Sequence, residues 1–247
     1  MMNILLTNDD GIDSEGLQKL AKLLRSNGKY KVSVIAPDVN RSGISNALSL
    51  LGGPVKLSAL GEDTWCCSGF PADCVLIGLK GVITERPDIV ISGINRGENL
   101  GSDIIYSGTA AAARQASLSG IPGIALYLAG RPPFNWDMAA SWSAEHVEKL
   151  LSHWKEGAFL NVNIPNQTGY PEGMEITWPA SKNYKDSLKL VTSLDGNQWC
   201  FLYGEEELTV SEEGSDCYTV SRNFVSVSIV RNYPVVLDLT IPKPVDN

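Results

Sequence analysis

The stretch "NILLTNDDGIDSEG" (residues 3–16) decides how the fold begins, because an apolar run there meets a polar turn and a helix-start signal. Residues 3–7 form a short apolar run that ends at a polar residue, which is typical of a buried strand. Asp13 or Ser14 follows as a candidate N-cap, and Glu15 falls in the first helical turn, where a carboxylate is favourable. We therefore predict a strand followed directly by a helix.

The same alternation of strand and helix continues along the chain. Leucines recur at helical spacing until Gly28, which supplies a helix terminator, and "KVSVIAP" (residues 31–37) predicts a second strand. Further strands are expected at residues 86–93, 121–128 and 159–165, and further helices at residues 107–120 and 139–154. This order predicts an α/β fold, with a mostly parallel sheet covered on both faces and right-handed crossovers.

The pattern changes from about Tyr184 onward. Residues 188–204 alternate around Asp195-Gly196, a pair that indicates a two-residue hairpin turn, and a second β stretch is expected at residues 218–230. Because a long hairpin must bury one apolar face, often against another subunit, we expect a homo-oligomer. We predict one domain over residues 1–247, with an α/β core at residues 1–183 and a β-rich arm and C-terminal segment at residues 184–247.

Composition and charge limit the class of protein. The chain has 247 residues, 43% of them hydrophobic, which is enough for one large domain. The first residues lack a basic region and no run of about 18 apolar residues occurs, so we expect a cytoplasmic protein without a membrane span. A net charge of −8 argues against binding to a nucleic-acid duplex or an anionic membrane. Two histidines and five cysteines argue against histidine chemistry, disulfide frameworks and zinc cages.

Three polar loops are expected to meet at one edge of the sheet. Ligands of an open parallel sheet bind beyond the carboxyl ends of its strands. Residues 8–11 follow the first strand, residues 38–45 follow the second, and residues 92–109 follow the central strand. All three loops combine glycine with polar side chains, so we place the functional site at this edge.

Asp9 and Asp10 are the strongest candidates for a metal site. Two adjacent carboxylates repel each other unless a cation lies beside them. Oxygen ligands suit Mg²⁺ or Mn²⁺, which usually keep waters and therefore leave room for a phosphate. The three loops offer a set of such oxygens on Asp9, Asp10, Ser42 and Asn95. The alternative is that N-D-D-G is only a common turn composition.

The loop at residues 92–109 favours an anion site. Its glycines free backbone N–H groups, and the loop ends at the start of an alanine-rich helix whose N-terminus attracts phosphate. Ser107 is also a plain N-cap candidate, and the two roles are compatible. Arg41 is a candidate phosphate clamp, with a solvated or paired arginine as the alternative. Asn99 and Asp103 either shape the loop or support the metal ligands.

Five stretches taken together make a family recognisable. In chain order they are "ILLTNDDGIDSEGL", "APDVNRSGISNALSL", "RPDIVISGINRGENLGSDIIYSGTAAAA", "FLNVNIP" and "GSDCYTVSRNFVSVSIV". They resemble the SurE survival-protein family of metal-dependent nucleotide phosphatases almost from end to end. The resemblance implies a three-layer, Rossmann-like core with a C-terminal β-hairpin oligomerisation extension. Arg96 and Ala110 depart from the family's usual residues, and neither is a candidate metal ligand.

The resemblance also implies an activity and a site. It implies a 5′-nucleotidase, acting also on 3′-phosphates, that uses one Mg or Mn ion and assembles as a homodimer or homotetramer through the arm. The family's metal ligands fall here on Asp9, Asp10, Ser42 and Asn95. We expect Asp9 and Asp10 to be the catalytic pair, supporting attack of a water on the nucleoside monophosphate. We expect substrate contacts from Asn8, Arg41, Gly43, Asn95, Asn99, Ser107, Gly108 and Thr109.

Two alternative functions remain open at the level of sequence. The first is a phosphatase that forms an aspartyl-phosphate on Asp9 or Asp10, although the loop at residues 92–109 has no lysine to assist it. The second is a non-catalytic, Mg-dependent phospho-receiver or nucleotide-sensing module. Such a receiver needs an aspartate after the middle strand, where this chain has Asn95.

Overall fold

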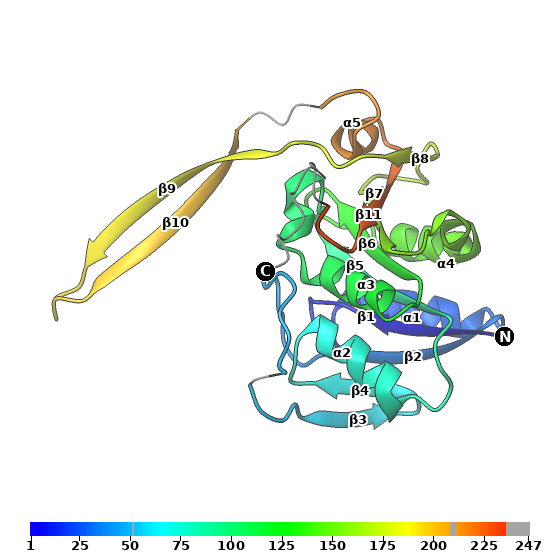
Figure 1. The fold of residues 1–247 in the computed structure, drawn as a ribbon. Helices are drawn as coiled ribbons and strands as arrows, with labels where there is room; N and C mark the ends of the chain where they lie inside the picture. The colour runs from blue at the N-terminus through cyan, green and yellow to red at the C-terminus, as the bar shows by residue number, and fades with distance from the viewer. Residues whose placement is uncertain (51, 208–210, 236–247) are drawn as a thin grey trace, which may run out of the picture.

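β1, the strand that opens the chain, lies near the middle of a nine-stranded sheet with the order β3-β4-β2-β1-β5-β6-β7-β11-β8 (Figure 1). The computed structural model describes residues 1–50, 52–207 and 211–235. The strands of this sheet are β1 (Met2–Thr7), β2 (Tyr30–Pro37), β3 (Leu57–Gly61), β4 (Thr64–Cys67), β5 (Ile89–Arg96), β6 (Gly123–Ala129), β7 (Ala158–Pro165), β8 (Met174–Thr177) and β11 (Val225–Arg231).

Helices cover both faces of this sheet (Figure 1). They are α1 (Glu15–Ser26), α2 (Pro71–Ile77), the short η1 (Gly78–Val82), the 3₁₀ helix η2 (Gly101–Ile105), α3 (Gly108–Leu118), α4 (Trp136–His153) and α5 (Asp216–Ser221). On one face, Leu20 of α1 and Val147 of α4 share a core with Ile4. On the other, Val75 of α2 shares a core with Leu5. Because neighbouring residues of β1 face opposite sides, the strand is apolar on both of its faces.

The strand pairings confirm the expected α/β architecture of three layers. β1 runs parallel to both of its neighbours, β2 and β5. β5, β6 and β7 are also parallel neighbours. Antiparallel pairs occur nearer the sheet edges, where β3 pairs with β4 and β11 pairs with β7. The carboxyl ends of the parallel strands therefore lie along one edge, as the sequence predicted.

The turn expected around Asp195-Gly196 is longer than two residues. The hairpin consists of β9 (Asn183–Thr192) and β10 (Gln198–Glu207), and its register leaves residues 193–197 as the turn. A two-residue turn of the expected type needs positive φ at both central residues. Gly196 has a φ of 86°, whereas Asp195 is not among the residues with positive φ. The prediction of a two-residue turn is therefore wrong, although the hairpin is present.

The second β stretch, expected at residues 218–230, is also wrong in part. Residues 216–221 form helix α5, whose N-cap Ser215 accepts a hydrogen bond at its Oγ from the backbone N–H of Tyr218, 3.3 Å away. The strand that follows, β11, lies between β7 and β8 in the main sheet. This strand therefore belongs to the core and not to the arm, while the single-domain organisation stays a prediction.

The arm is the β9–β10 hairpin, which forms its own two-stranded sheet and extends away from the rest of the molecule (Figure 1). Many of its large apolar side chains are exposed: Leu188, Leu190, Val191, Leu194, Trp199, Phe201, Leu202 and Tyr203. An element this apolar and this exposed is typical of a subunit interface. Its role in oligomerisation stays a prediction.

Three findings bear on the expectations from composition. Within the described ranges, no helix combines the length and apolarity needed to cross a lipid bilayer. None of the five cysteines, all of which lie in the described part of the chain, forms a disulfide bond. Both histidines lie on α4, where His146 stacks on Trp142 with ring centroids 4.2 Å apart and His153 occupies the last turn.

Candidate active site

The three loops predicted to converge do so at the carboxyl edge of the sheet. They border a cleft of about 280 Å³, which the start of α3 also lines. The lining residues are Asp9, Ser42, Gly43, Asn95, Arg96, Glu98, Asn99, Asp103, Tyr106 and Ser107. Six of the residues predicted from sequence as ligands or contacts line the cleft: Asp9, Ser42, Gly43, Asn95, Asn99 and Ser107. The other five predicted residues are not among its lining residues: Asn8, Asp10, Arg41, Gly108 and Thr109.

Asp9 lies at the bottom of this cleft, immediately after β1, and is 3% exposed. The Thr109 hydroxyl donates a hydrogen bond to Asp9 Oδ1. The pKa of Asp9 is raised to about 6, mainly because the carboxyl is buried; the Thr109 hydrogen bond lowers it and the charge of Asp10 adds to the rise. The charged form of Asp9 is therefore poorly solvated and would be stabilised by a nearby cation.

Gly108 allows α3 to approach Asp9 closely. A Cβ added at this glycine would lie 2.9 Å from the Cβ of Asp9 and 3.0 Å from its Oδ2. Separations this short do not occur between real side chains, so only glycine fits at this position. The first turn of α3 is therefore packed directly on the carboxylate, with Thr109 bonded to it and Gly108 touching it.

Asp10 bridges the second and third loops. Its Oδ2 accepts a hydrogen bond from the backbone N–H of Arg96 at 3.0 Å, and its Oδ1 accepts one from Asn40 Nδ2 at 3.3 Å. Burial raises the pKa of Asp10, and the hydrogen bond and charge of Arg96 oppose that shift. The two aspartates therefore face different partners although they are adjacent in the chain.

The loop after β2 is held against Asp9 by its backbone. The Arg41 N–H donates to the carbonyl of Asp9 at 2.7 Å, and the Ser42 N–H donates to Asn40 Oδ1 at 2.8 Å. Gly43 follows with a φ of 74°, a conformation that favours glycine. These contacts place Ser42 and Gly43 at the cleft beside Asp9.

The side chain of Arg41 points elsewhere. Its guanidinium donates to Asp38 Oδ1 at 3.1 Å and to the Ser68 carbonyl at 3.0 Å, and it lies 5.7 Å from the ring centroid of Phe70. The alternative of a paired arginine therefore describes the structure. The guanidinium is thus engaged by Asp38 and Ser68, and the phosphate clamp expected at Arg41 stays a prediction.

Asn8 also has a structural role in this arrangement. It is fully buried, and its Nδ2 donates to the Gly11 carbonyl at 2.9 Å and to Ser14 Oγ at 2.6 Å. The N–H of Gly11 in turn donates to Asn8 Oδ1 at 3.3 Å. Asn8 therefore shapes the acidic turn and connects it to the N-cap of α1. Its contact with a substrate stays a prediction.

Asn95 lies inside β5 and not in the loop after it, which corrects the expected strand end at residue 93. The pairing of β5 with β6 shifts register between Ser92 and Asn95. Gly93 makes this possible, since its φ is 136° and an added Cβ would lie 2.4 Å from the Leu126 carbonyl oxygen. Asn95 Nδ2 donates to the carbonyls of Arg96 and Gly97 at 3.3 and 3.1 Å, which turns its Oδ1 away from them.

Ser107 begins α3 and lines the cleft at the same time. Its Oγ accepts a hydrogen bond from the Ala110 N–H at 3.0 Å and lies 3.1 Å from the hydroxyl of Tyr127. The N-cap interpretation is therefore correct, and it leaves the N–H groups of Gly108 and Thr109 at the positive end of the helix. This end of α3 faces the acidic turn.

Two asparagines of β7 that sequence reasoning missed hold the third loop. Asn163 Oδ1 accepts from the Asn99 N–H at 3.0 Å, while Asn161 Nδ2 and Asn163 Nδ2 donate to the Asn99 carbonyl at 2.9 and 3.1 Å. Both asparagines are fully buried. Their signal in the sequence is the pair of amides at alternate positions of an otherwise apolar strand, "FLNVNIP".

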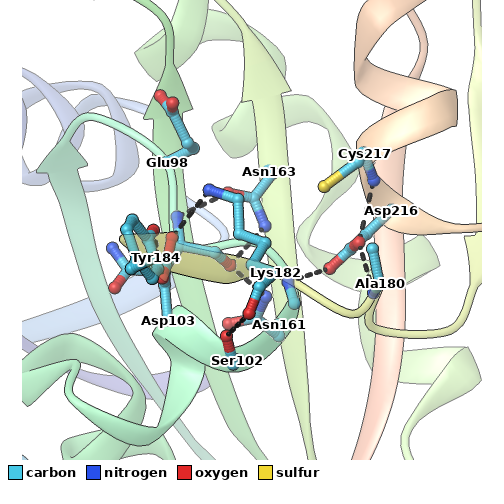
Figure 2. Close-up of polar contacts among 12 residues, drawn as sticks. Glu98, Ser102, Asp103, Asn161, Asn163, Ala180, Lys182, Tyr184, Asp216 and Cys217 are labelled. Carbon is cyan, nitrogen blue, oxygen red and sulfur yellow. Dashed lines mark hydrogen bonds and ion pairs between the residues drawn. The ribbon is translucent and has the colours of Figure 1, made fainter. Parts of the chain in front are cut away.

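A second missed set of residues comes from the C-terminal part of the chain (Figure 2). Asp216, which is fully buried, accepts hydrogen bonds from the N–H groups of Gly101 at 2.7 Å and Ala180 at 2.8 Å. Asp103, in η2, is bonded to Lys182 and Tyr184 at the root of the arm. Nothing local in the sequence links residues this far apart.

Taken together, these observations describe an α/β protein with an open parallel sheet whose carboxyl edge carries an acidic, oxygen-rich site beside a helix N-terminus. This is the class of site that binds phosphate with the help of a hard cation.

Comparison with known proteins identifies the family. The model for the family "Survival protein SurE" matches residues 4–186, and the chain belongs to this family. A protein of Geobacter sulfurreducens named 5'-nucleotidase SurE is 39% identical over 244 residues, covering 97% of this chain and 89% of the relative. A relative of the same name from Acinetobacter baumannii strain SDF is 37% identical, covering 96% of this chain and 98% of that one. The crystal structure of the SurE protein from Aquifex aeolicus superposes with a TM-score of 0.80 at 35% identity, covering 96% and 94% of the two chains.

Proposed function

We propose that this protein is a divalent-metal-dependent nucleotidase that hydrolyses nucleoside 5′-monophosphates, and also 3′-monophosphates, to nucleoside and phosphate. The observation that carries the proposal is the carboxylate pair of the buried Asp9 and the half-buried Asp10, packed through Asp9 against the N-terminus of α3. A carboxylate pair alone repels a phosphate, and a helix N-terminus alone does not cleave one. A cation held by the carboxylate pair would offset its repulsion of phosphate, while the helix N-terminus binds the phosphate oxygens. The names of the relatives, 5'-nucleotidase SurE, support the same activity.

The residues at this edge fit one Mg or Mn ion. Within the described ranges, no group of three or more His, Cys, Asp or Glu side chains is placed to hold a metal, so neutral oxygens must complete the set. Ser42 Oγ and Asn95 Oδ1 make no hydrogen bond to another described residue, and both side chains line the cleft with Asp9. We assign the ion to Asp9, Asp10, Ser42 and Asn95. An ion held there would polarise the phosphate oxygens and lower the pKa of a bound water.

The protein's own residues orient the substrate and move a proton. The N–H groups of Gly108 and Thr109, at the positive end of α3, donate to phosphate oxygens and stabilise the charge that develops on them. Gly43 and Asn99 border the phosphate from the other loops. One carboxylate of the pair Asp9 and Asp10 accepts the proton that the attacking water releases. No histidine is needed for this step.

Incubation of the purified protein with AMP and Mn²⁺ or Mg²⁺ tests the proposal. We expect phosphate release that stops with a chelator and returns when the ion is restored. Asp9→Asn removes ligand charge with little change of shape, so this variant should fold, lose phosphate release and bind Mn²⁺ more weakly in calorimetry. Wild-type protein that binds Mn²⁺ but releases no phosphate from a panel of nucleoside monophosphates would contradict the proposal.

The aspartyl-phosphate alternative is tested in the same preparation. Lysine is missing among the residues that line the cleft, so the described part of the site lacks the cation that such a mechanism uses. Trapping with a phosphate mimic and mass analysis of the N-terminal peptide should find no stable adduct on Asp9 or Asp10. An adduct would replace the proposed water attack with a covalent step.

We further propose that the protein is cytoplasmic and forms a homodimer or homotetramer through the β9–β10 arm. The exposed apolar residues of the arm support this assembly. The net charge of −8 supports small nucleotides, and not nucleic-acid duplexes or membranes, as the partners.

A further inference from the structure

The root of the arm is bonded to the part of the third loop that borders the cleft (Figure 2). Ser102 Oγ donates to the carbonyl of Lys182 at 3.2 Å, and Asp216 ties the N–H groups of Gly101 and Ala180 together from the other side. A Cβ added at Gly101 would lie 2.3 Å from the Ala180 carbonyl oxygen, so the two segments are in direct contact. The segment at residues 180–182, which leads into β9, therefore packs against the loop that borders the cleft.

Asp103 is a residue of this loop that lines the cleft, and two side chains of the arm root hold it (Figure 2). Lys182 Nζ lies 2.8 Å from Asp103 Oδ2, and the Tyr184 hydroxyl donates to Asp103 Oδ1 at 2.6 Å. The Lys182 side chain is only 5% exposed and that of Asp103 is 20% exposed. An ion pair this sheltered is weakly screened by salt.

The ion pair between Lys182 and Asp103 affects how many negative charges line the cleft. Among the residues that the structure describes, three carboxylates line the cleft, those of Asp9, Glu98 and Asp103, together with one cation, Arg96. A phosphate monoester is itself an anion, so each uncompensated carboxylate weakens its binding. Asp9 is assigned to the metal, whereas Asp103 is compensated by Lys182 from the arm root.

We propose that Lys182 is a positioning residue of the substrate site, which neutralises Asp103 and, with Tyr184, holds its carboxylate back so that an anionic phosphate can enter. The inference rests on the proposed function, because it concerns the same substrate. It assigns to the arm a part in substrate affinity in addition to any part in assembly. Burial, and then the hydrogen bond to Asp103, raise the pKa of Tyr184 to about 12, so Tyr184 remains a neutral donor to this carboxylate.

Steady-state kinetics with AMP and Mn²⁺ on four proteins test the inference. Lys182→Met leaves Asp103 uncompensated and should raise KM about tenfold with kcat nearly unchanged, since the effect is on binding. Asp103→Asn alone removes the repelling charge and should lower KM about twofold. The double variant Lys182→Met/Asp103→Asn should return KM to within about twofold of wild type, because the charge that Lys182 balanced is gone.

A control variant and two further measurements separate the effect of charge from a change in structure. Lys185→Met is the matched control: Lys185 lies at an exposed position in β9, three residues after Lys182, and its loss should leave KM unchanged. Calorimetry with inorganic phosphate in the presence of Mn²⁺ should show the same order of affinities as KM, without depending on turnover. The loss in Lys182→Met should also be larger at low ionic strength, because a repulsion between charges is screened by salt.

The outcomes distinguish this inference from the proposed function. Wild-type protein that releases no phosphate from any nucleotide overturns the proposed function, and phosphate calorimetry then decides the inference by itself. Wild-type activity with an unchanged KM in Lys182→Met, or with no recovery in the double variant, overturns the inference alone. Should Lys182→Met fail to fold, Asp103→Asn still decides, because a tenfold rise in its KM would mean that the carboxylate aids binding.

Discussion

At the scale of single residues, the site depends on how closely α3 approaches Asp9. Thr109 donates to the carboxylate and Gly108 leaves no room for a side chain between the helix and the carboxylate. Two residues of α3 thus determine the position and charge of Asp9, and Thr109 is 100 positions away from it in the sequence. Two substitutions test these two contacts separately.

Gly108→Ala should displace Asp9 while leaving the fold intact. The new Cβ would lie 2.9 Å from Asp9 Cβ, so the carboxylate or the helix must shift by several tenths of an ångström. We expect kcat/KM for AMP to fall by about tenfold, because a misplacement of about 1 Å costs about 100-fold and this shift is smaller. Gly61→Ala is the matched control, since an added Cβ there meets nothing within 4 Å. Equal kinetics for both variants would contradict the close contact.

Thr109→Val should weaken metal binding without unfolding the protein. Valine has nearly the shape of threonine, but it removes the hydrogen bond to Asp9 Oδ1 that favours the charged carboxylate. We expect the Mn²⁺ dissociation constant from calorimetry to rise by about tenfold or more, as is usual when a residue that supports a ligand is lost. Thr109→Ser retains a hydroxyl and should stay near wild type. A Thr109→Val protein with wild-type Mn²⁺ affinity would exclude this support.

At the scale of elements, β7 acts as the anchor of the third loop. Asn161 and Asn163 face the same side of this strand, and both bond the backbone of Asn99. A loop has few internal contacts to hold its shape, so a rigid strand that satisfies its N–H and carbonyl groups makes the cleft reproducible. The strand thereby connects the sheet to the geometry of the site.

Asn163→Ala should lower both stability and substrate affinity. It removes the acceptor of the Asn99 N–H, while the Asn99 carbonyl keeps its hydrogen bond from Asn161. Leaving a buried N–H unsatisfied costs about 1–3 kcal/mol in the free energy of unfolding. Urea denaturation measures that loss, and KM for AMP should rise in the same variant. Asn46→Ala, at an exposed position with one hydrogen bond of 3.4 Å, should change neither. An unchanged free energy of unfolding in Asn163→Ala would show that the third loop keeps its shape without this hydrogen bond.

At the scale of the whole molecule, the arm stands out because its apolar surface is not covered within a single chain. Its strands pair Leu188 with Leu202, and both side chains are more than half exposed. The central strands β5, β6 and β7 of the main sheet bury their apolar residues, whereas the arm has only its own two strands. A two-stranded hairpin is marginal by itself in water, so a partner surface is expected to stabilise it.

Leu188→Glu/Leu202→Glu should therefore convert the oligomer to a monomer. Light scattering coupled to size-exclusion chromatography measures the mass, with Lys185→Glu as a control that alters charge on the same strand but removes no apolar surface. Circular dichroism should remain that of a folded α/β protein, because both leucines are exposed in the single chain. An unchanged mass would place the subunit interface elsewhere.

Much of the fold follows from patterns that are local in the sequence. The apolar run at residues 3–7, the helix-start signal before Glu15 and the terminator at Gly28 lie within a few residues of what they control, and β1, α1 and β2 form where they predict. The edge that holds the site follows as well, because parallel strands bring their carboxyl ends together. For that reason the order of strands and loops along the chain is enough to place Asp9, Ser42 and Asn95 at the same cleft.

Only the tertiary structure decided which way the side chains at this edge face. Arg41 turns to Asp38, Asn8 closes its own turn, and Asp103 is held by Lys182 from the arm root. The hydrophobic pattern of the sequence does not predict these partners. A buried polar group is costly when unpaired, so each one bonds to whichever group the packing of distant segments brings within reach. The chain's own pattern therefore determined the sheet and its edge, whereas long-range packing determined which residues enter the cleft and which support it.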